Sequence, residues 1–181
     1  MVEDWKNLSS EELADYHIFK LRRETRRSPR TGADHSFFVL QTPDWINVIP
    51  LTPAGKVVMI HQFRQGTSKV TLEIPGGMVD ANESDPAEAA RRELLEETGY
   101  AADELIHIGT VDPNPAFLDN QCHTYLALGV RWQQAPAFDG AEDIGVEEVA
   151  LDEIAGLIGN GRITHALVVA AFYHYENYRR V

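Results

Sequence analysis

The feature that most constrains this chain is a helix with clearly marked ends that follows a pair of glycines. Asp85 is a suitable N-cap, and Pro86 suits the first helical position because a backbone N–H would have no helical partner there. Gly99 is typical of the left-handed residue that ends a helix. Upstream, residues 70–74 are β-prone and are followed by a Pro-Gly-Gly break. The sequence therefore predicts a strand, a glycine loop and then a helix.

One face of this helix is acidic. At 3.6 residues per turn, Glu93, Glu96 and Glu97 fall within an arc of roughly 100°. Like charges this close repel by a few tenths of a kcal/mol per pair, and the small Ala89 in the same arc leaves room for a cation. Carboxylates without Cys or His favour Mg²⁺ or Mn²⁺ over zinc. A solvated helix surface is the alternative interpretation.

The segment from Gly77 to Tyr100 resembles the signature of the Nudix hydrolases. That signature has a glycine, a spaced glutamate, and then Arg-Glu-aliphatic-x-Glu-Glu-x-Gly-aliphatic, and here Glu83 and the run beginning at Arg92 occupy those roles. Two departures stand out: eight residues separate Glu83 from Arg92 where the usual pattern has seven, and Tyr100 replaces the last aliphatic residue. The extra residue leaves the role of Glu83 unassigned.

The resemblance implies a metal site and a catalytic role for the acidic helix. In that family the residues matching Glu93 and Glu97 are metal ligands, and the one matching Glu96 assists them directly or through water. The carbonyl group of Gly76 is expected to complete the site, and two or more Mg²⁺ ions, with Mn²⁺ as a substitute, are expected to bridge the diphosphate. Arg92 is then a partner that holds one of the glutamates in its rotamer.

Further residues resemble the subgroup that cleaves ADP-ribose and other nucleoside diphosphate sugars. The run ending in Arg64 and the run containing Glu73 carry this resemblance, and both residues are predicted to bind substrate. We expect Arg64 to contact a phosphate or the terminal ribose, with a surface ion pair as the alternative. Trp45 and Phe117 are candidates for stacking on a nucleobase, although a core or interface role for Trp45 is an alternative.

The subgroup uses a glutamate in a loop after the central strands as the catalytic base. Glu142 occupies the corresponding stretch and is our prediction for this role, with Asp143 and Glu147 as further candidates. A solvated acidic loop is the alternative interpretation.

The order of predicted elements indicates an α+β fold with a mixed sheet. Ser9 or Ser10 could cap a short N-terminal helix before a strand over residues 16–26, and Thr164 could cap the last helix. The β-prone runs comprise residues 35–41, 45–51 and 56–63, predicted as an antiparallel meander, and residues 105–111, 123–130 and 146–151. This agrees with the α/β/α sandwich that the resemblance implies.

Length predicts one substantial core: with 181 residues, we expect a Nudix domain over residues 35–181 and an N-terminal helix and strand extension over residues 1–34. In the subgroup, N-terminal strands exchange between protomers, so residues 16–50 are expected to contribute to a homodimer. The formal charge of −12 argues against nucleic acid or anionic membranes as partners. A cluster of arginines could bind a phosphate locally, and a solvated strand face is the alternative interpretation. The cluster comprises Arg22, Arg23, Arg26, Arg27 and Arg30.

Cys122 is the only cysteine, so no intrachain disulfide can form. The N-terminal residues lack an apolar signal region, and no stretch approaches 18 uninterrupted apolar residues. We therefore expect the protein in the cytoplasm.

Together these features predict Mg²⁺-dependent hydrolysis of the diphosphate bond of a nucleoside diphosphate sugar, ADP-ribose first, to a nucleoside monophosphate and a sugar phosphate. Two alternatives stay open. One is a nucleoside triphosphate or RNA 5′-end pyrophosphatase of the same superfamily, and the other is a nucleotide-sugar sensor that has lost catalysis.

Overall fold

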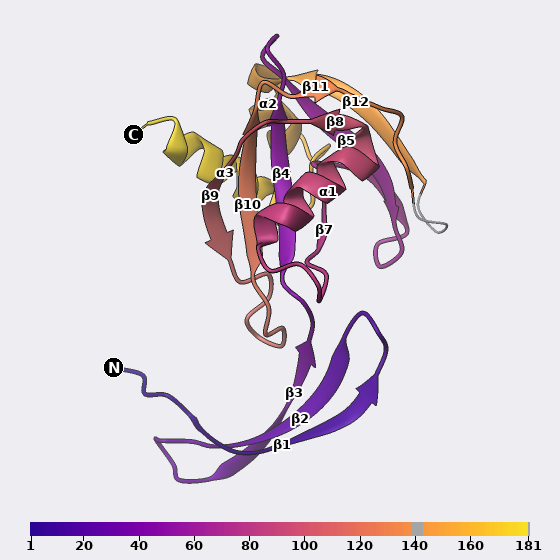
Figure 1. The fold of residues 1–181 in the computed structure, drawn as a ribbon. Helices are drawn as coiled ribbons and strands as arrows, with labels where there is room; N and C mark the ends of the chain where they lie inside the picture. Colours follow the sequence, from indigo (N-terminus) through magenta and orange to yellow (C-terminus); the bar gives the residue numbers. More distant parts are fainter. Residues whose placement is uncertain (139–142, 181) are drawn as a thin grey trace. The chain divides into compact units, whose positions relative to one another are not determined.

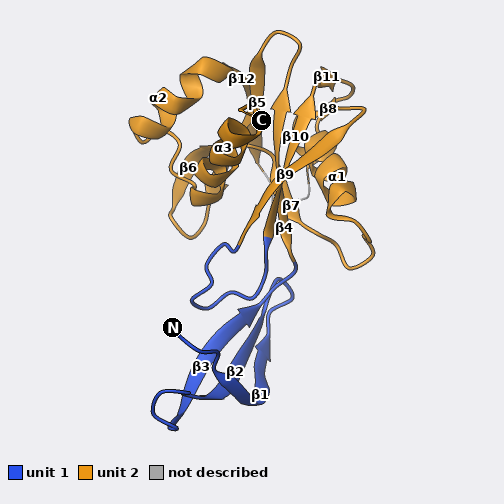
Figure 2. Ribbon diagram, turned by 90° about the vertical axis from the view of Figure 1, so that its left-hand side faces the viewer, with its two compact units in different colours: residues 1–43, 112–121 blue, residues 44–111, 122–181 orange. Residues whose placement is uncertain are grey.

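The computed structural model describes residues 1–138 and 143–180, and these form two compact units. Unit 1 comprises Met1–Pro43 and Asp112–Gln121, and unit 2 comprises Asp44–Val111 and Cys122–Val181 (Figure 2). Each unit has its own sheet.

Unit 1 is an antiparallel three-stranded sheet of β1 (Lys6–Asp15), β2 (Lys20–Arg27) and β3 (Asp34–Gln41). The predicted N-terminal helix is wrong, because residues 6–15 pair along β2 instead. Cross-strand ion pairs join Glu11 to Arg23 and Glu12 to Lys20. These partners are distant in sequence, so the capping pattern at residues 9–12 could not reveal them.

Unit 2 is built on a mixed seven-stranded sheet. Its main path runs β12 (Ile144–Ala150), β5 (Lys56–Arg64), β4 (Trp45–Leu51), β10 (Cys122–Leu128) and β9 (Leu105–Val111), with β6 (Lys69–Glu73) paired to β5 and β7 (Gly76–Met78) paired to β4. A small ribbon pairs β8 (Tyr100–Ala101) with β11 (Arg131–Trp132). The pairing of β4 with β10 is parallel, and the other pairs of the sheet are antiparallel.

Helices cover both faces of this sheet (Figures 1 and 2). One face packs against α1 (Pro86–Thr98) through a cluster that includes Val48, Val58 and Leu94. The other face packs against η1 (Leu151–Glu153), α2 (Ile154–Gly159) and α3 (Ala166–Tyr178) through Ile49, Met59, Phe172 and their neighbours. Neighbouring residues of β4 and β5 thus alternate between the two cores, as the period of a strand requires.

Three details differ from the sequence-based expectations. The predicted meander is interrupted, because β3 and β4 belong to different sheets. Part of the predicted glycine loop is strand β7, since its backbone pairs with β4. Thr164 is not the cap of the last helix: α3 has His165 at this position, with no hydrogen bond from its side chain.

The boundaries of α1 agree with the prediction. The Asp85 carboxylate accepts a hydrogen bond of 2.9 Å from the Ala87 N–H, and Pro86 is the first helical residue. Gly99 ends the helix with a φ of 75°, a conformation that costs glycine little. No helix in the described part of the chain is both long and apolar enough to cross a membrane.

Candidate active site

Strand β7 brings two glycines against the acidic face of α1. The pairing of β7 with β4 places Gly76 opposite Asn47 and Gly77 opposite Ile46. The Gly76 N–H donates a 2.9 Å hydrogen bond to Oε2 of Glu97. A Cβ atom at Gly77 would lie only 2.0 Å from Oε1 of Glu93. The helix can approach this strand so closely at Gly77 because glycine carries no side chain there, whereas a Cβ at Gly76 would instead meet the Ile46 carbonyl group of β4.

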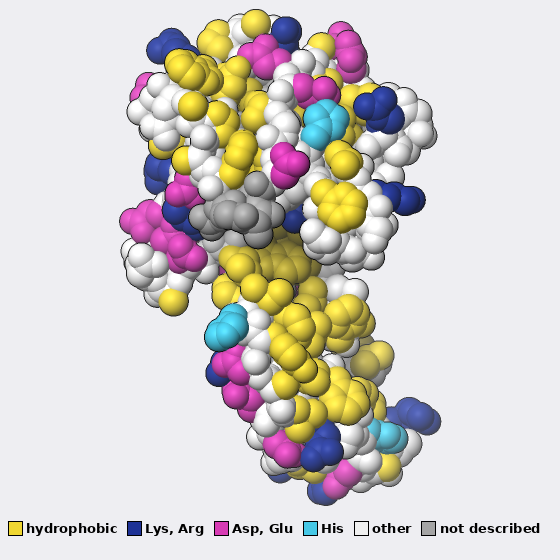
Figure 3. All heavy atoms as spheres, turned by 90° about the vertical axis from the view of Figure 1, so that its right-hand side faces the viewer, with side chains coloured by type: hydrophobic (Ala, Val, Ile, Leu, Met, Phe, Trp, Pro, Cys, Tyr) yellow, Lys and Arg dark blue, Asp and Glu magenta, His cyan; other side chains and the backbone are white. Residues whose placement is uncertain are grey.

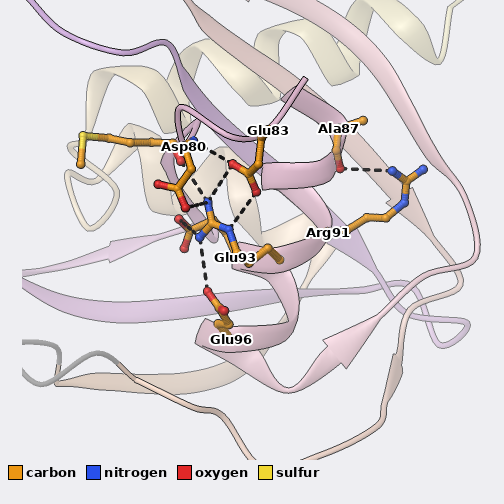
Figure 4. A network of polar contacts seen from close by, with 8 residues as sticks. Asp80, Glu83, Ala87, Arg91, Glu93 and Glu96 are labelled. Carbon is orange, nitrogen blue, oxygen red and sulfur yellow. Dashed lines mark hydrogen bonds and ion pairs between the residues drawn. The ribbon is translucent and has the colours of Figure 1, made fainter. Parts of the chain in front are cut away.

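Arg92 contacts four acidic side chains that Figure 4 labels: Asp80, Glu83, Glu93 and Glu96. Its Nη1 donates to Oε1 of Glu93 at 2.8 Å and to Oε2 of Glu96 at 3.3 Å. Its Nε donates to Oε1 of Glu83 at 2.9 Å, and its Nη2 donates to the Met78 carbonyl at 3.1 Å. One guanidinium group thus connects the helix to the loop that precedes it.

Glu83 is held from two sides. Besides Arg92, the Asp80 N–H donates to its Oε2 at 2.8 Å. The hydrogen bonds from Arg92 lower the pKa of Glu83, and those that Arg92 makes to Glu83 and Glu93 raise the pKa of Arg92. The extra residue before the helix therefore does not prevent Glu83 from reaching Arg92.

The three helical glutamates differ in exposure. Glu97 is only 2% exposed, while the side chain of Glu93 is 14% exposed and that of Glu96 is 46% exposed. A carboxylate as buried as Glu97 needs hydrogen bonds or positive charge nearby, and the Gly76 N–H supplies one hydrogen bond. The face thus runs from a buried carboxylate to one open to solvent.

The residues on this face have the chemistry that a hard divalent cation requires. As the side chains lie, no group of three or more acidic, histidine or cysteine residues within residues 1–138 and 143–180 converges on one point that could hold an ion. The surplus of negative charge is nevertheless large: Arg92 faces carboxylates from Glu83, Glu93 and Glu96, with Glu97 adjacent on the helix. Oxygen ligands of this type suit Mg²⁺ or Mn²⁺.

Arg64 and Glu73 form an ion pair on the neighbouring strands β5 and β6. Arg64 donates from Nε to Oε1 at 2.9 Å and from Nη2 to Oε2 at 2.8 Å. Glu73 is buried, and the hydroxyl group of Thr71 also donates to it. Burial acts to raise the pKa of Glu73, but the hydrogen bonds from Arg64 and Thr71 outweigh it, so the pKa is lowered.

The two aromatic candidates belong to different units. Trp45 is the first residue of β4 in unit 2, partly buried, with Met78 and Cys122 as its strand partners. Phe117 belongs to the 112–121 segment of unit 1 and is exposed. The N–H of Leu40 donates to the Phe117 carbonyl, which ties this segment to β3.

Of the three base candidates, Glu142 lies outside the described residues. Asp143 is exposed and directly precedes β12. Glu147 lies on β12, and its Oε2 is 3.0 Å from Nε2 of His61. It is the strand partner of Met59, whose side chain lies in the core on the α3 side of the sheet. The side chain of Glu147 is therefore on the face opposite to the acidic helix.

The structure adds residues to this region that the sequence reasoning missed. Thr71 lies two residues before Glu73 on β6, so the period of a strand could have indicated that their side chains share a face. His165, with Nε2 at 3.8 Å from Oε2 of Glu73, lies 92 positions further along the chain, and no local pattern signals it.

Four of the five arginines of the N-terminal cluster form ion pairs within unit 1. Arg22 contacts Asp119, Arg23 contacts Glu11, and Arg27 contacts Asp34. Arg26 contacts the buried Glu24. These pairs favour the interpretation of a structural strand face over that of a phosphate site.

Comparison with known proteins finds relatives that match nearly the whole chain. The chain is 30% identical over 172 residues to the methanol dehydrogenase activator of Bacillus methanolicus, covering 94% of this chain and 92% of that protein. It is 29% identical over 173 residues to the ADP-ribose pyrophosphatase of Bacillus subtilis (strain 168), with the same coverage of 94% and 92%.

Structural comparison supports the fold. A crystal structure of an ADP compounds hydrolase matches with a TM-score of 0.86 and 18% sequence identity, covering 99% of this chain and 96% of that one. It confirms the predicted α+β Nudix-like fold. The family model of the NUDIX domain matches residues 42–172. Since that match covers well over half of the chain, the protein belongs to the Nudix hydrolase family, as residues 77–100 predicted.

Proposed function

We propose that this enzyme hydrolyses the diphosphate bond of a nucleoside diphosphate sugar, with ADP-ribose as the first candidate. The observation that carries the proposal is the set of carboxylates around Arg92, directly against the bare backbone of Gly76 and Gly77. Similarity to the ADP-ribose pyrophosphatase of B. subtilis along nearly the whole chain supports the substrate class. The products would be a nucleoside monophosphate and a sugar phosphate.

Two or more Mg²⁺ ions, with Mn²⁺ as a substitute, would be held by Glu93, Glu96, Glu97 and the Gly76 carbonyl. Bound there, they would neutralise charge on the diphosphate and lower the pKa of a water molecule. Arg92 keeps Glu93 and Glu96 on this face through the hydrogen bonds from its Nη1. It also ties them to Glu83, so that these carboxylates are held in fixed positions from which they would bind a metal ion.

Substrate contacts are proposed for Arg64, Trp45 and Phe117. The guanidinium group of Arg64 would bind a phosphate or the terminal ribose, since its planar donors match such oxygens. Trp45 would stack on the nucleobase, with Phe117 as a second candidate for that role. Glu142 remains the proposed general base that deprotonates the attacking water.

A homodimer is proposed from unit 1. None of the buried hydrophobic side chains in the described chain belongs to this unit, whose buried side chains are Glu24, Ser28 and Asn120. Large apolar residues on it are exposed, including Trp5, Leu13, Phe37 and Phe38. Figure 3 shows hydrophobic side chains gathered along this part of the molecule. A three-stranded sheet without a core of its own needs a covering surface, and a second copy would supply one.

We further propose that the protein acts in the cytoplasm and on a small molecule, with neither nucleic acid nor membrane as its partner. Cys122 is buried and free, so the fold does not depend on an oxidising compartment. The formal charge of −12 disfavours polyanionic partners.

Sedimentation equilibrium would test the proposed homodimer, since a monomer at micromolar concentration would contradict it.

The test of the activity is a panel of substrates with Mg²⁺, scored by kcat/KM. ADP-ribose, GDP-mannose, UDP-glucose, nucleoside triphosphates and 5′-triphosphorylated RNA would be compared under the same conditions. We expect a nucleotide sugar to give the highest value and EDTA to abolish turnover. Preference for a triphosphate would overturn the substrate class, and binding of ADP-ribose without turnover would establish a sensor instead.

A further inference from the structure

Glu73 is a buried carboxylate that faces the side edge of one guanidinium group. It is 2% exposed, and its two oxygens accept from Nε and Nη2 of Arg64 at 2.9 and 2.8 Å. Glu73 on β6 is the strand partner of Ile60 on β5. Ile60 lies four residues before Arg64 on β5. The side chains of Glu73 and Arg64 therefore lean toward each other along the strands, and the guanidinium group is held over the sheet.

The remaining neighbours of Glu73 favour a carboxylate that is committed to Arg64. The hydroxyl group of Thr71 donates to Oε1, and Nε2 of His165 lies 3.8 Å from Oε2. Burial lowers the pKa of His165, so this ring is neutral near pH 7 and does not compete with Arg64 as a cation. Nδ1 of His165 is buried and has no hydrogen-bond partner among the described residues.

We propose that Glu73 is a positioning residue for Arg64 and does not touch the substrate. It holds the guanidinium group by its Nε and Nη2 side and so fixes the orientation in which Arg64 meets an anionic oxygen of a nucleoside diphosphate. The proposal rests on the phosphate-binding role proposed for Arg64. It revises the sequence-based assignment of Glu73 to substrate binding, because a side chain this buried, with both oxygens accepting hydrogen bonds, offers no surface to a ligand.

The physical gain is pre-organisation. A free arginine side chain would have to be immobilised when the substrate binds, whereas a guanidinium group fixed on two hydrogen bonds has already lost that freedom. For one side chain this corresponds to roughly 3- to 10-fold in affinity. Since the effect acts on binding, it should appear in KM and leave the chemical step nearly unchanged.

The experiment is a double-mutant cycle of Arg64→Ala and Glu73→Gln. Each variant is measured for kcat and KM with ADP-ribose, and for the Kd of methylenediphosphonate, a non-hydrolysable diphosphate, in the presence of Mg²⁺. We expect Glu73→Gln to raise KM and Kd by about 3- to 10-fold with kcat nearly unchanged. In the Arg64→Ala background the same substitution should have no further effect. A Glu73→Gln effect that persists in full without Arg64, or unchanged KM and Kd, would overturn the proposal.

Glu176→Gln is the matched control. Glu176 also pairs with an arginine, accepting from Nε of Arg179 at 2.8 Å, but this pair is exposed on α3. The same chemical change there should leave KM and Kd unaltered. An equal rise in Kd for this variant would show a general charge effect and refute the specific role of Glu73.

A spectroscopic measurement on the wild-type protein covers the case in which Glu73→Gln does not fold. The ¹⁵N signal of Arg64 Nε, assigned by its loss in Arg64→Lys, should stay in place when methylenediphosphonate is added, while the Nη signals shift. A large shift of Nε would mean that the ligand displaces Glu73. If the wild type hydrolyses no nucleotide sugar, the proposed function fails, yet diphosphonate binding still decides the role of Glu73.

Discussion

Arg92 and Glu83 contact each other through two hydrogen bonds, 2.9 Å from Nε to Oε1 and 3.2 Å from Nη2 to Oε2, although the segment between them is one residue longer than the family pattern. Asp85 nevertheless caps α1 by accepting a hydrogen bond from the Ala87 N–H, and Arg92, Glu93 and Glu96 all lie within this helix. Glu83 thereby joins Glu93 and Glu96 as a partner of the same guanidinium group.

Glu83→Gln should lower thermal stability, and the loss should depend on pH. Arg92 depresses the pKa of Glu83 below its ordinary value of 4.5, so the carboxylate stabilises the fold above that pH, and this contribution disappears as the pH falls through the lowered pKa. We expect the Tm of the variant to lie below that of the wild type at pH 7 and the two values to converge as the pH falls below the lowered pKa of Glu83. A difference in Tm that stays constant over this range would show that Glu83 acts without its charge.

Glu97→Gln should reduce kcat by about 10²-fold with the fold intact, if loss of a metal ligand resembles loss of another electrostatic catalytic group. The buried carboxylate would become neutral, while its oxygen could still accept from the Gly76 N–H. Glu88→Gln is the control, because Glu88 is exposed in the first turn of the same helix. Activity of Glu97→Gln within a few-fold of the parent would refute its assignment as a metal ligand.

Gly77→Ala should lower kcat/KM by about 10²-fold, since displacement of a catalytic group by about 1 Å has that effect. The new Cβ would lie 2.0 Å from Oε1 of Glu93, and that side chain must move away. Gly66→Ala is the control, because a Cβ there meets nothing within 4 Å. Full activity of Gly77→Ala would mean that the observed position of Glu93 is not needed for catalysis.

Glu142→Gln should abolish most of the turnover while Mg²⁺ binding, measured by calorimetry, is retained. The reason is that a general base contributes typically 10²- to 10⁴-fold to the rate without holding the metal. Glu147→Gln is a suitable comparison, because its carboxylate pairs with His61 on the α3 side of the sheet. If Glu147→Gln loses turnover and Glu142→Gln keeps it, the two assignments must be exchanged.

Cys122 should resist thiol reagents in the native protein. Burial, aided by the charge of Asp44, raises the pKa of its thiol to about 12, so almost no thiolate exists at pH 8. We expect negligible reaction with a disulfide reagent under native conditions and one equivalent after unfolding in guanidinium chloride. Rapid labelling of the native enzyme would contradict the buried position at the start of β10.

Local chemistry in the sequence was sufficient to predict the helix of the site. The Asp85 cap, the proline at its start and the left-handed Gly99 are all present as predicted, because each acts within one turn of the chain. The spacing of the glutamates likewise needed only the helical period. The same local reasoning failed at residues 6–15, where a cap-like pattern lies in a strand. There the pairing with β2 outweighs a weak local preference.

Long-range packing decided the rest. The pairing of β7 with β4 brings the bare backbone of Gly77 to the carboxylate of Glu93, and the strand register places Glu147 on the face away from the acidic helix. The approach of His165 to Glu73 depends on where α3 begins relative to β6. Such contacts join residues that share no local pattern, so the sequence by itself determined the family and the composition of the metal face, while the tertiary structure determined which side chains hold one another in place.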